Sequence, residues 1–189
     1  MISSYFGDII CLILKKGVLS LKLDTRKLAV SAMLITLDVL LTRVLAINTP
    51  LMKVGFGFAA VAVCAMLYGP VWAMLTAALG DIVGAIIFPV GAFFPGFTLT
   101  AALTGLIYGL FLYRHQHSLW RPILAAFFNC LVVTLILNTA LIAYISGNDY
   151  TVLFAARIVQ FCIMFPVEAI VMLCLNRSGL MVKLIEEYK

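Results

Sequence analysis

Five charged side chains lie inside stretches of sequence that are otherwise apolar, and their chemistry needs an explanation. They are Asp38, Arg43, Asp81, Arg157 and Glu168. A charge in the middle of a membrane span costs about 2.5–3.5 kcal/mol, so each requires a partner or a function. A rise of about 1.5 Å per residue from the outer end of each apolar run places four polar residues in one layer, about 10–12 Å deep. This layer holds Asp38, Asp81, Asn138 and Arg157, with Arg43 nearer the mouth.

A polar layer shared by four helices predicts a cavity that opens to the outside. Arginine offers a planar fork that suits a carboxylate, and Gln160 shares a helix face with Arg157. A carboxylate such as Asp81 suits the opposite pattern, namely adjacent N–H donors on a flat heterocycle. Alternatively, Asp81 could neutralise Arg157, or Asp38 could neutralise Arg43, without any ligand. Glu168 lies farther along, near the cytoplasmic side, where it is expected to reach water or a partner.

The composition indicates which elements position these residues. The 189 residues are 65% apolar and 11% charged, with a mean hydropathy of +1.16, which is typical of an all-α integral membrane protein. We expect six transmembrane helices in a membrane domain over residues 26–177. The expected spans are residues 26–46, 56–68, 69–88, 98–113, 120–146 and 151–176.

The basic residues predict the orientation of these helices. Lysine and arginine precede the first span, flank the 114–121 loop and follow the last span, so both termini are predicted to be cytoplasmic. Residues 1–25 are expected to form an interfacial segment, and residues 178–189 a cytoplasmic tail. The net charge of +5 is explained by this orientation and does not indicate nucleic-acid binding.

The segment 88–97 combines two prolines and two glycines with four phenylalanines. Non-helical backbone at membrane depth is tolerated only where protein or a water-filled cavity shields it. We therefore expect this segment to line the cavity with Phe93, Phe94 and Phe97. We expect the next helix to begin near Thr98 as its N-cap, with its positive end favouring an anion.

Other motifs argue against catalysis. There is no G-x-x-x-x-G-K-[ST] and no H-E-x-x-H, and both histidines fall in the 114–117 loop. The cysteines are scattered without a C-x-x-C pair and are interpreted as small apolar residues; they are Cys11, Cys64, Cys130, Cys162 and Cys174. We expect no enzyme activity, cofactor or metal.

Several longer segments resemble a known family. The sequences KVGFGF (53–58), GDIVGAIIFP (80–89) and PGFTL (95–99) are similar to those of the folate-family S components of energy-coupling factor (ECF) vitamin transporters. The similarity covers about residues 26–177. It implies a six-helix S-component fold with an external vitamin site, gated by the first and third external loops.

The resemblance also implies partners. Energy would come from a transmembrane coupling subunit and two ATP-binding cassette ATPases, and the chain would topple in the membrane to deliver its substrate. The small-residue face of the first helix would contact the coupling subunit, here through Ala29, Ala32 and Thr36, although the spacing departs from a strict Ala-x-x-x-Ala.

Folate is the leading substrate, because its pterin has a donor edge and its glutamate has carboxylates. The expected substrate-binding residues are Arg43, Lys53, Asp81, Phe93, Phe94, Phe97, Thr98, Asn138, Arg157 and Gln160. A pyridoxine- or hydroxymethylpyrimidine-like vitamin is the alternative for the same fold. A stand-alone proton-coupled transporter and a ligand-free membrane scaffold are alternatives of other classes.

Overall fold

The computed structural model describes residues 25–48, 53–89, 94–113, 118–146 and 150–178. Within these ranges the chain forms six helical segments, two of which contain π-helical turns. They are α2 (Thr25–Val39) with η1 (Leu40–Val44), α3 (Phe58–Tyr68), α4 (Pro70–Ile87), α5 (Pro95–Leu112), α6 (Trp120–Phe128) with η2 (Asn129–Leu137) and α7 (Asn138–Ser146), and α8 (Tyr150–Arg177).

The prediction of an all-α membrane domain is confirmed. Four helices are long and apolar enough to cross a bilayer, namely Pro70–Ile87, Pro95–Leu112, Trp120–Ile145 and Leu153–Arg177. The helix α3 is apolar but has only 11 residues, which is about 16 Å of helix. Large apolar side chains point outward, among them Met33, Ile86 and Leu99, each about three-quarters exposed. The chain is therefore a multi-pass membrane protein.

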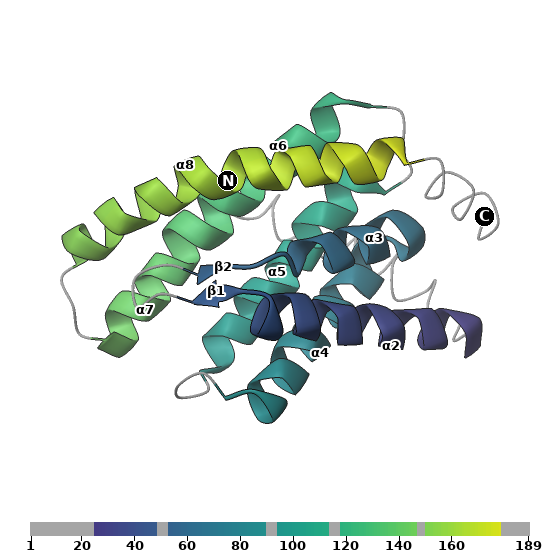
Figure 1. The fold of residues 1–189 in the computed structure, drawn as a ribbon, viewed down its shortest axis with the longest axis horizontal. Helices are drawn as coiled ribbons and strands as arrows, with labels where there is room; N and C mark the ends of the chain where they lie inside the picture. The colour runs from purple at the N-terminus through teal and green to yellow at the C-terminus, as the bar shows by residue number, and fades with distance from the viewer. Residues whose placement is uncertain (1–24, 49–52, 90–93, 114–117, 147–149, 179–189) are drawn as a thin grey trace, which may run out of the picture.

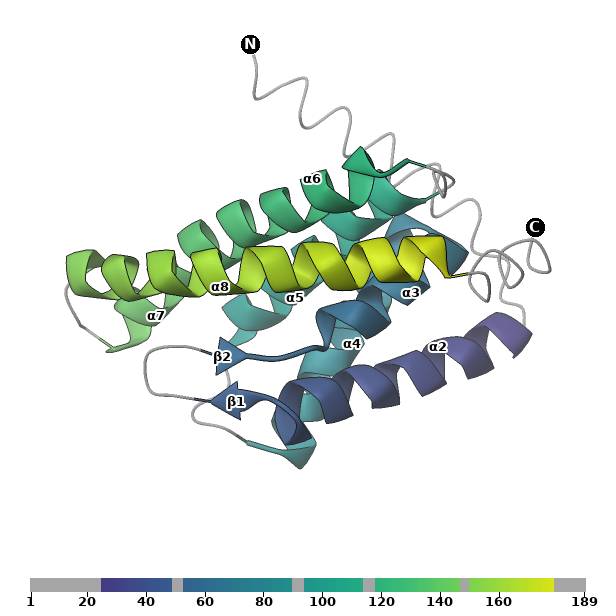
Figure 2. The ribbon, with the colours of Figure 1, turned by 45° about the horizontal axis from the view of Figure 1, so that its top comes forward.

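The helices α2 and α8 lie on opposite sides of the molecule, with α3 between them (Figures 1 and 2). The end of α4, the start of α5, the end of α7 and the start of α8 lie at one end of the molecule (Figure 1). The start of α2 and the end of α8 both lie at the opposite end of the molecule. Six crossings bring the first and last helices back to one side; that this side is cytoplasmic stays a prediction.

The connection between the first two predicted spans contains a short hairpin. Strand β1 (Ile47–Asn48) pairs antiparallel with β2 (Lys53–Val54), so that Ile47 faces Val54 and Asn48 faces Lys53. Two residues per strand are too few for an alternating pattern to be visible in the sequence.

The start of α5 also differs from the prediction. The helix begins at Pro95 with Phe94 as its N-cap residue, so the prediction of Thr98 as N-cap is wrong. Proline is favoured in the first turn of a helix because the N–H that it lacks has no helical partner there. Thr98 therefore lies inside the first turn, where its side chain contacts α4 instead.

Glycines in α5 allow it to lie against the start of α4. A Cβ on Gly105 would lie 2.6 Å from the carbonyl carbon of Ala73, and one on Gly109 would overlap the backbone of Pro70. The core around this contact consists largely of small side chains, together with the fully buried Tyr108. Small residues that let backbones approach closely are the usual means of packing helices in lipid.

We expect Gly105→Ala to lower the thermal unfolding temperature of the detergent-purified protein by several degrees. Overpacking against backbone costs about 1–3 kcal/mol, which outweighs the gain of up to about 1 kcal/mol from placing alanine in a helix. Leu99→Ala is the control, because Leu99 is 74% exposed on the same helix. An unfolding temperature for Gly105→Ala equal to or above that of wild type would contradict this packing.

Candidate functional site

A cavity of about 440 Å³ lies among the helices and is lined by residues from all six helical segments. Its apolar wall includes Phe58, Phe94 and Phe97. Its polar lining consists of Asp38, Thr42, Arg43, Asp81, Thr100, Thr104, Asn129, Thr134, Asn138, Arg157, Gln160 and Glu168. So many polar groups at membrane depth are expected only where they pair with one another or face a ligand.

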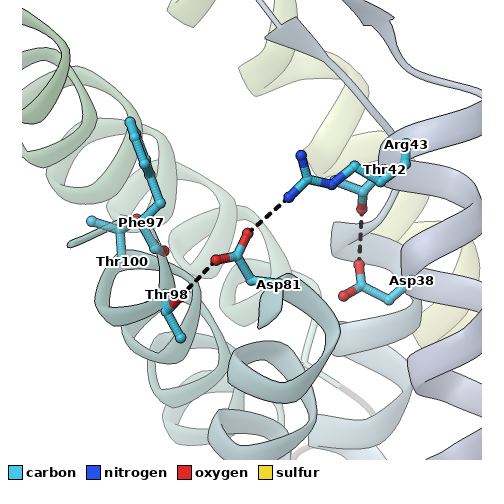
Figure 3. A network of polar contacts seen from close by, with 7 residues as sticks. All are labelled: Asp38, Thr42, Arg43, Asp81, Phe97, Thr98 and Thr100. Atoms are coloured by element: carbon cyan, nitrogen blue, oxygen red, sulfur yellow. Dashed lines mark hydrogen bonds and ion pairs between the residues drawn. The ribbon is translucent and has the colours of Figure 1, made fainter. Parts of the chain in front are cut away.

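One end of the cavity is held by an ion pair between the first helix and α4 (Figure 3). The Nη2 of Arg43, in η1, lies 3.3 Å from Oδ1 of Asp81. The other oxygen of Asp81 accepts a hydrogen bond of 2.8 Å from the Thr98 hydroxyl at the start of α5. Both side chains of the pair are partly buried, and the contacts of Asp81 fix three helices relative to one another.

A second carboxylate of the same wall, Asp38, is enclosed by glycines. Its Oδ1 accepts a hydrogen bond of 3.0 Å from Thr42, one turn along the helix (Figure 3). A Cβ on Gly57 or on Gly80 would overlap an oxygen of this carboxylate, so only glycine lets the backbones of α3 and α4 approach it. Asp38 is thereby kept at the cavity wall, 8% exposed.

The GDIVGAIIFP segment can now be explained in physical terms. Gly80 makes room for Asp38, Asp81 pairs with Arg43, and a Cβ on Gly84 would lie 3.0 Å from the Arg43 Nε. The three residues lie on the side of α4 that faces the first helix. The π-helical turn η1 also changes the helical register at Arg43, and such turns are frequent at functional sites.

On the opposite wall, Arg157 of α8 has unused hydrogen-bonding capacity. Its Nη1 donates a hydrogen bond of 2.5 Å to Oε1 of Gln160, yet its Nε has no partner in the described part of the chain. The Asn138 Oδ1 is also buried without a partner among the described residues. Both residues line the cavity. Because unsatisfied buried polar groups are rare and costly, these two residues are candidates for ligand contacts.

Farther along α8, Glu168 anchors a buried polar cluster. Its Oε1 accepts a hydrogen bond of 2.7 Å from Asn129 Nδ2, and its Oε2 accepts one of 2.9 Å from the Cys130 thiol. Asn129 Nδ2 also donates to the Tyr108 hydroxyl at 2.8 Å. Glu168 is only 2% exposed, and Glu168, Asn129 and Cys130 line the cavity.

Most of the residues predicted for a binding site are brought together in this cavity, although their roles in binding stay predictions. Those lining it are Arg43, Asp81, Phe94, Phe97, Asn138, Arg157 and Gln160. Thr98 contacts Asp81 but does not line the cavity. Lys53 lies in β2, and Phe93 lies outside the described residues.

Two interpretations from the sequence are corrected here. Glu168 was placed near cytoplasmic water or a partner, but it faces the cavity. Cys130 was interpreted as a small apolar residue, but it lines the cavity and donates a hydrogen bond to Glu168. Asp81 pairs with Arg43 in place of the Asp81–Arg157 pair considered from the sequence. Among the described residues, no three His, Cys, Asp or Glu side chains form a group suited to a metal ion.

Comparisons with known proteins agree on one family. Residues 26–176 match the family described as ECF transporter, substrate-specific component. The folate transporter FolT of Clostridium novyi (strain NT) is 44% identical over 140 residues, which is 74% of this chain and 81% of the relative. FolT of Leuconostoc mesenteroides subsp. mesenteroides is 38% identical over 153 residues, covering 78% and 82%. A crystal structure of FolT bound with folic acid has a TM-score of 0.77 and 32% identity, covering 81% of this chain and 93% of that chain.

We expect the Arg43–Asp81 pair to behave as one unit in a double-mutant cycle. Arg43→Ala and Asp81→Ala should each lower the unfolding temperature, because each leaves its partner's charge uncompensated in a partly buried site. The double variant should lower the unfolding temperature by less than the sum of the two single decreases. Arg177→Ala is the control, since Arg177 is exposed in the last turn of α8. Strictly additive losses would contradict an energetic role for the pair.

Proposed function

The chain belongs to the family of substrate-specific components of ECF transporters, and on this premise we propose that it captures folate outside the cell for an ATP-driven importer. Two relatives are named folate transporters, and the similar crystal structure contains folic acid. Energy is supplied by partners, a coupling subunit and two ATP-binding cassette ATPases. The loaded chain topples in the membrane to release folate inside.

The observation that carries the substrate assignment is the unpaired hydrogen-bonding capacity of Arg157 inside the cavity. A guanidinium group with a free N–H is suited to a carboxylate, and folate ends in a glutamate with two. Asn138, with its unpaired oxygen, lines the same cavity. The Arg43 guanidinium is engaged by Asp81 and is therefore the less available of the two cations.

The dimensions of the cavity favour folate over a single small ring. Arg157 and Glu168 both line it and lie eleven residues apart on α8, which is about 16 Å along the helix axis. A pyrimidine or pyridine ring would occupy only one end of such a cavity. A pterin joined through a benzene ring to glutamate is long enough to reach both.

We expect Arg157→Ala to weaken folate binding by at least tenfold in titration calorimetry of the detergent-purified protein. A hydrogen bond to a charged group contributes about 1.5–3 kcal/mol, which corresponds to about 10–100-fold in affinity.

Cys162→Ala is the matched control for this variant. Cys162 is exposed on α8 five residues from Arg157, whereas Cys130 lines the cavity and would not serve as a control. Equal folate affinities for Arg157→Ala and Cys162→Ala would remove Arg157 from the site.

The partner assignment is supported by the outer face of α2. Ala29, Ala32 and Thr36 are all exposed on this helix. The hydroxyl of Thr36 donates to the Ala32 carbonyl at 3.0 Å, so its polar group is satisfied within the helix and the face is effectively apolar. Beside it lies a groove of about 410 Å³ between α2 and α4, lined by Leu28, Ser31, Ala32, Ile35, Trp72, Leu75, Thr76 and Leu79. Such a face is suited to the close approach of another membrane helix.

The same helix therefore carries both proposed contacts. Ala32 is exposed on the outside of the helix, and Asp38, six residues farther along, lines the cavity. A partner that binds α2 would therefore contact a helix that also lines the cavity. This arrangement supports a mechanism in which docking on the coupling subunit is sensed at the binding cavity.

We expect Ala32→Trp to abolish ATP-dependent folate uptake in vesicles that contain the complete transporter, because a bulky side chain blocks close helix contact. Folate binding by the isolated chain should stay within twofold of wild type, since Ala32 does not line the cavity.

Ile170→Trp is the control for steric bulk on the membrane surface. Ile170 is 60% exposed, and its helix α8 lies on the other side of the molecule from α2 (Figure 1). Full uptake activity in Ala32→Trp would place the partner contact elsewhere.

A further inference from the structure

The deep cluster around Glu168 is not explained by the arginine that binds a carboxylate. We propose that Glu168 and Asn129 form a second subsite, which recognises the N–H donor edge of the ligand's heterocycle. This inference rests on the proposed function, because it assigns the pterin end of folate within the same cavity. It makes Glu168 a specificity-determining residue.

The hydrogen bonds of the cluster leave acceptors available for a ligand. Glu168 uses one bond on each oxygen, to Asn129 and to Cys130, and a carboxylate oxygen can accept two. Asn129 Oδ1 is buried and has no partner among the described residues. Glu168 and Asn129 both line the cavity, and together they have three acceptor atoms with unused capacity.

The orientation of the Asn129 amide is fixed by its neighbours. One N–H group donates to Glu168 and the other to the Tyr108 hydroxyl. If the amide were reversed, its oxygen would face the carboxylate, where it would find no donor. Tyr108 is fully buried and lies outside the cavity lining, so it acts as a positioning residue for Asn129.

The other two carboxylates of the cavity are less suited to this role. Asp81 accepts from Arg43 on one oxygen and from Thr98 on the other, and its charge is balanced by the arginine. Asp38 is enclosed between Gly57 and Gly80. The partners of Glu168 are neutral donors that leave each of its oxygens with an unused acceptor position, so both oxygens can accept from adjacent N–H groups of a ligand. A pterin presents such a pair, its ring N–H and its 2-amino group.

The two subsites determine the orientation in which the ligand binds. Glu168 lies about 16 Å along α8 from Arg157, so a ligand with donors at one end and carboxylates at the other can satisfy both. With the pterin at Glu168 and the glutamate at Arg157, each end meets groups of complementary charge. In the reverse direction the glutamate would face a carboxylate and the donor edge would face a guanidinium.

The test separates the two ends of the ligand by calorimetry. Folate is compared with pteroate, which retains the pterin and lacks the glutamate. Glu168→Gln, which replaces one acceptor by a donor at nearly constant size, should weaken folate and pteroate by a similar factor of about 10–100. Arg157→Ala should weaken folate binding but leave the affinity for pteroate within about threefold of the wild-type value. Ile170→Ala, at an exposed position on the same helix, should change neither affinity.

A second measurement requires no variant and so does not depend on how Glu168→Gln folds. Wild-type protein should bind a folate analogue with a methyl group in place of the 2-amino group at least tenfold more weakly than folate. Equal affinity for the two ligands would overturn the Glu168 subsite. So would pteroate binding that Glu168→Gln leaves unchanged. If wild-type protein binds neither folate nor pteroate, the proposed function fails as well, which is a different result from tight folate binding that is insensitive to Glu168.

Discussion

The structure depends on the cost of placing charged groups at membrane depth, where each must be paired, hydrogen-bonded or matched by a ligand. Some of the charges satisfy one another and hold helices together, as Arg43 and Asp81 do between the first helix and α4. Others keep unused hydrogen-bonding capacity and line the cavity, above all Arg157 and Glu168. We interpret the first group as scaffold and the second as recognition chemistry. The division explains why so apolar a chain keeps five charges inside its helices.

Glycine is the residue that makes the scaffold possible. Gly80 on α4 and Gly57 before α3 leave room for the Asp38 carboxylate, which a Cβ at either position would overlap, and Gly84 on α4 leaves room for the Arg43 side chain. The close approach encloses Asp38 and fixes Arg43 against Asp81. The segments that resemble the family in the sequence thus have a structural role. In these segments the small residues let the helices approach closely, and the charged residues make contacts between the helices.

Much of this arrangement could be predicted from the sequence, and the exceptions have physical causes. Apolar run lengths gave the six helices, and counting residues from the outer ends brought Asp81, Asn138 and Arg157 to one cavity. Glu168 was misplaced because a depth count gives a position along one helix but not how deep the cavity extends. Thr98 was misassigned because its hydroxyl was matched to a backbone cap, although a proline in the first turn indicated an earlier start. π-Helical turns shift the register without any clear sequence pattern, so side chains beyond them could not be assigned to a face.

The central claim is that folate lies along α8, with its glutamate at Arg157 and its pterin at Glu168. The most direct test is an experimental structure of this chain with folate, at a resolution that distinguishes the two ends of the ligand. The account predicts that a glutamate carboxylate lies within hydrogen-bonding distance of the Arg157 guanidinium and that the 2-amino group lies beside the Glu168 carboxylate. Folate bound in the opposite direction, or bound outside the cavity, would contradict it.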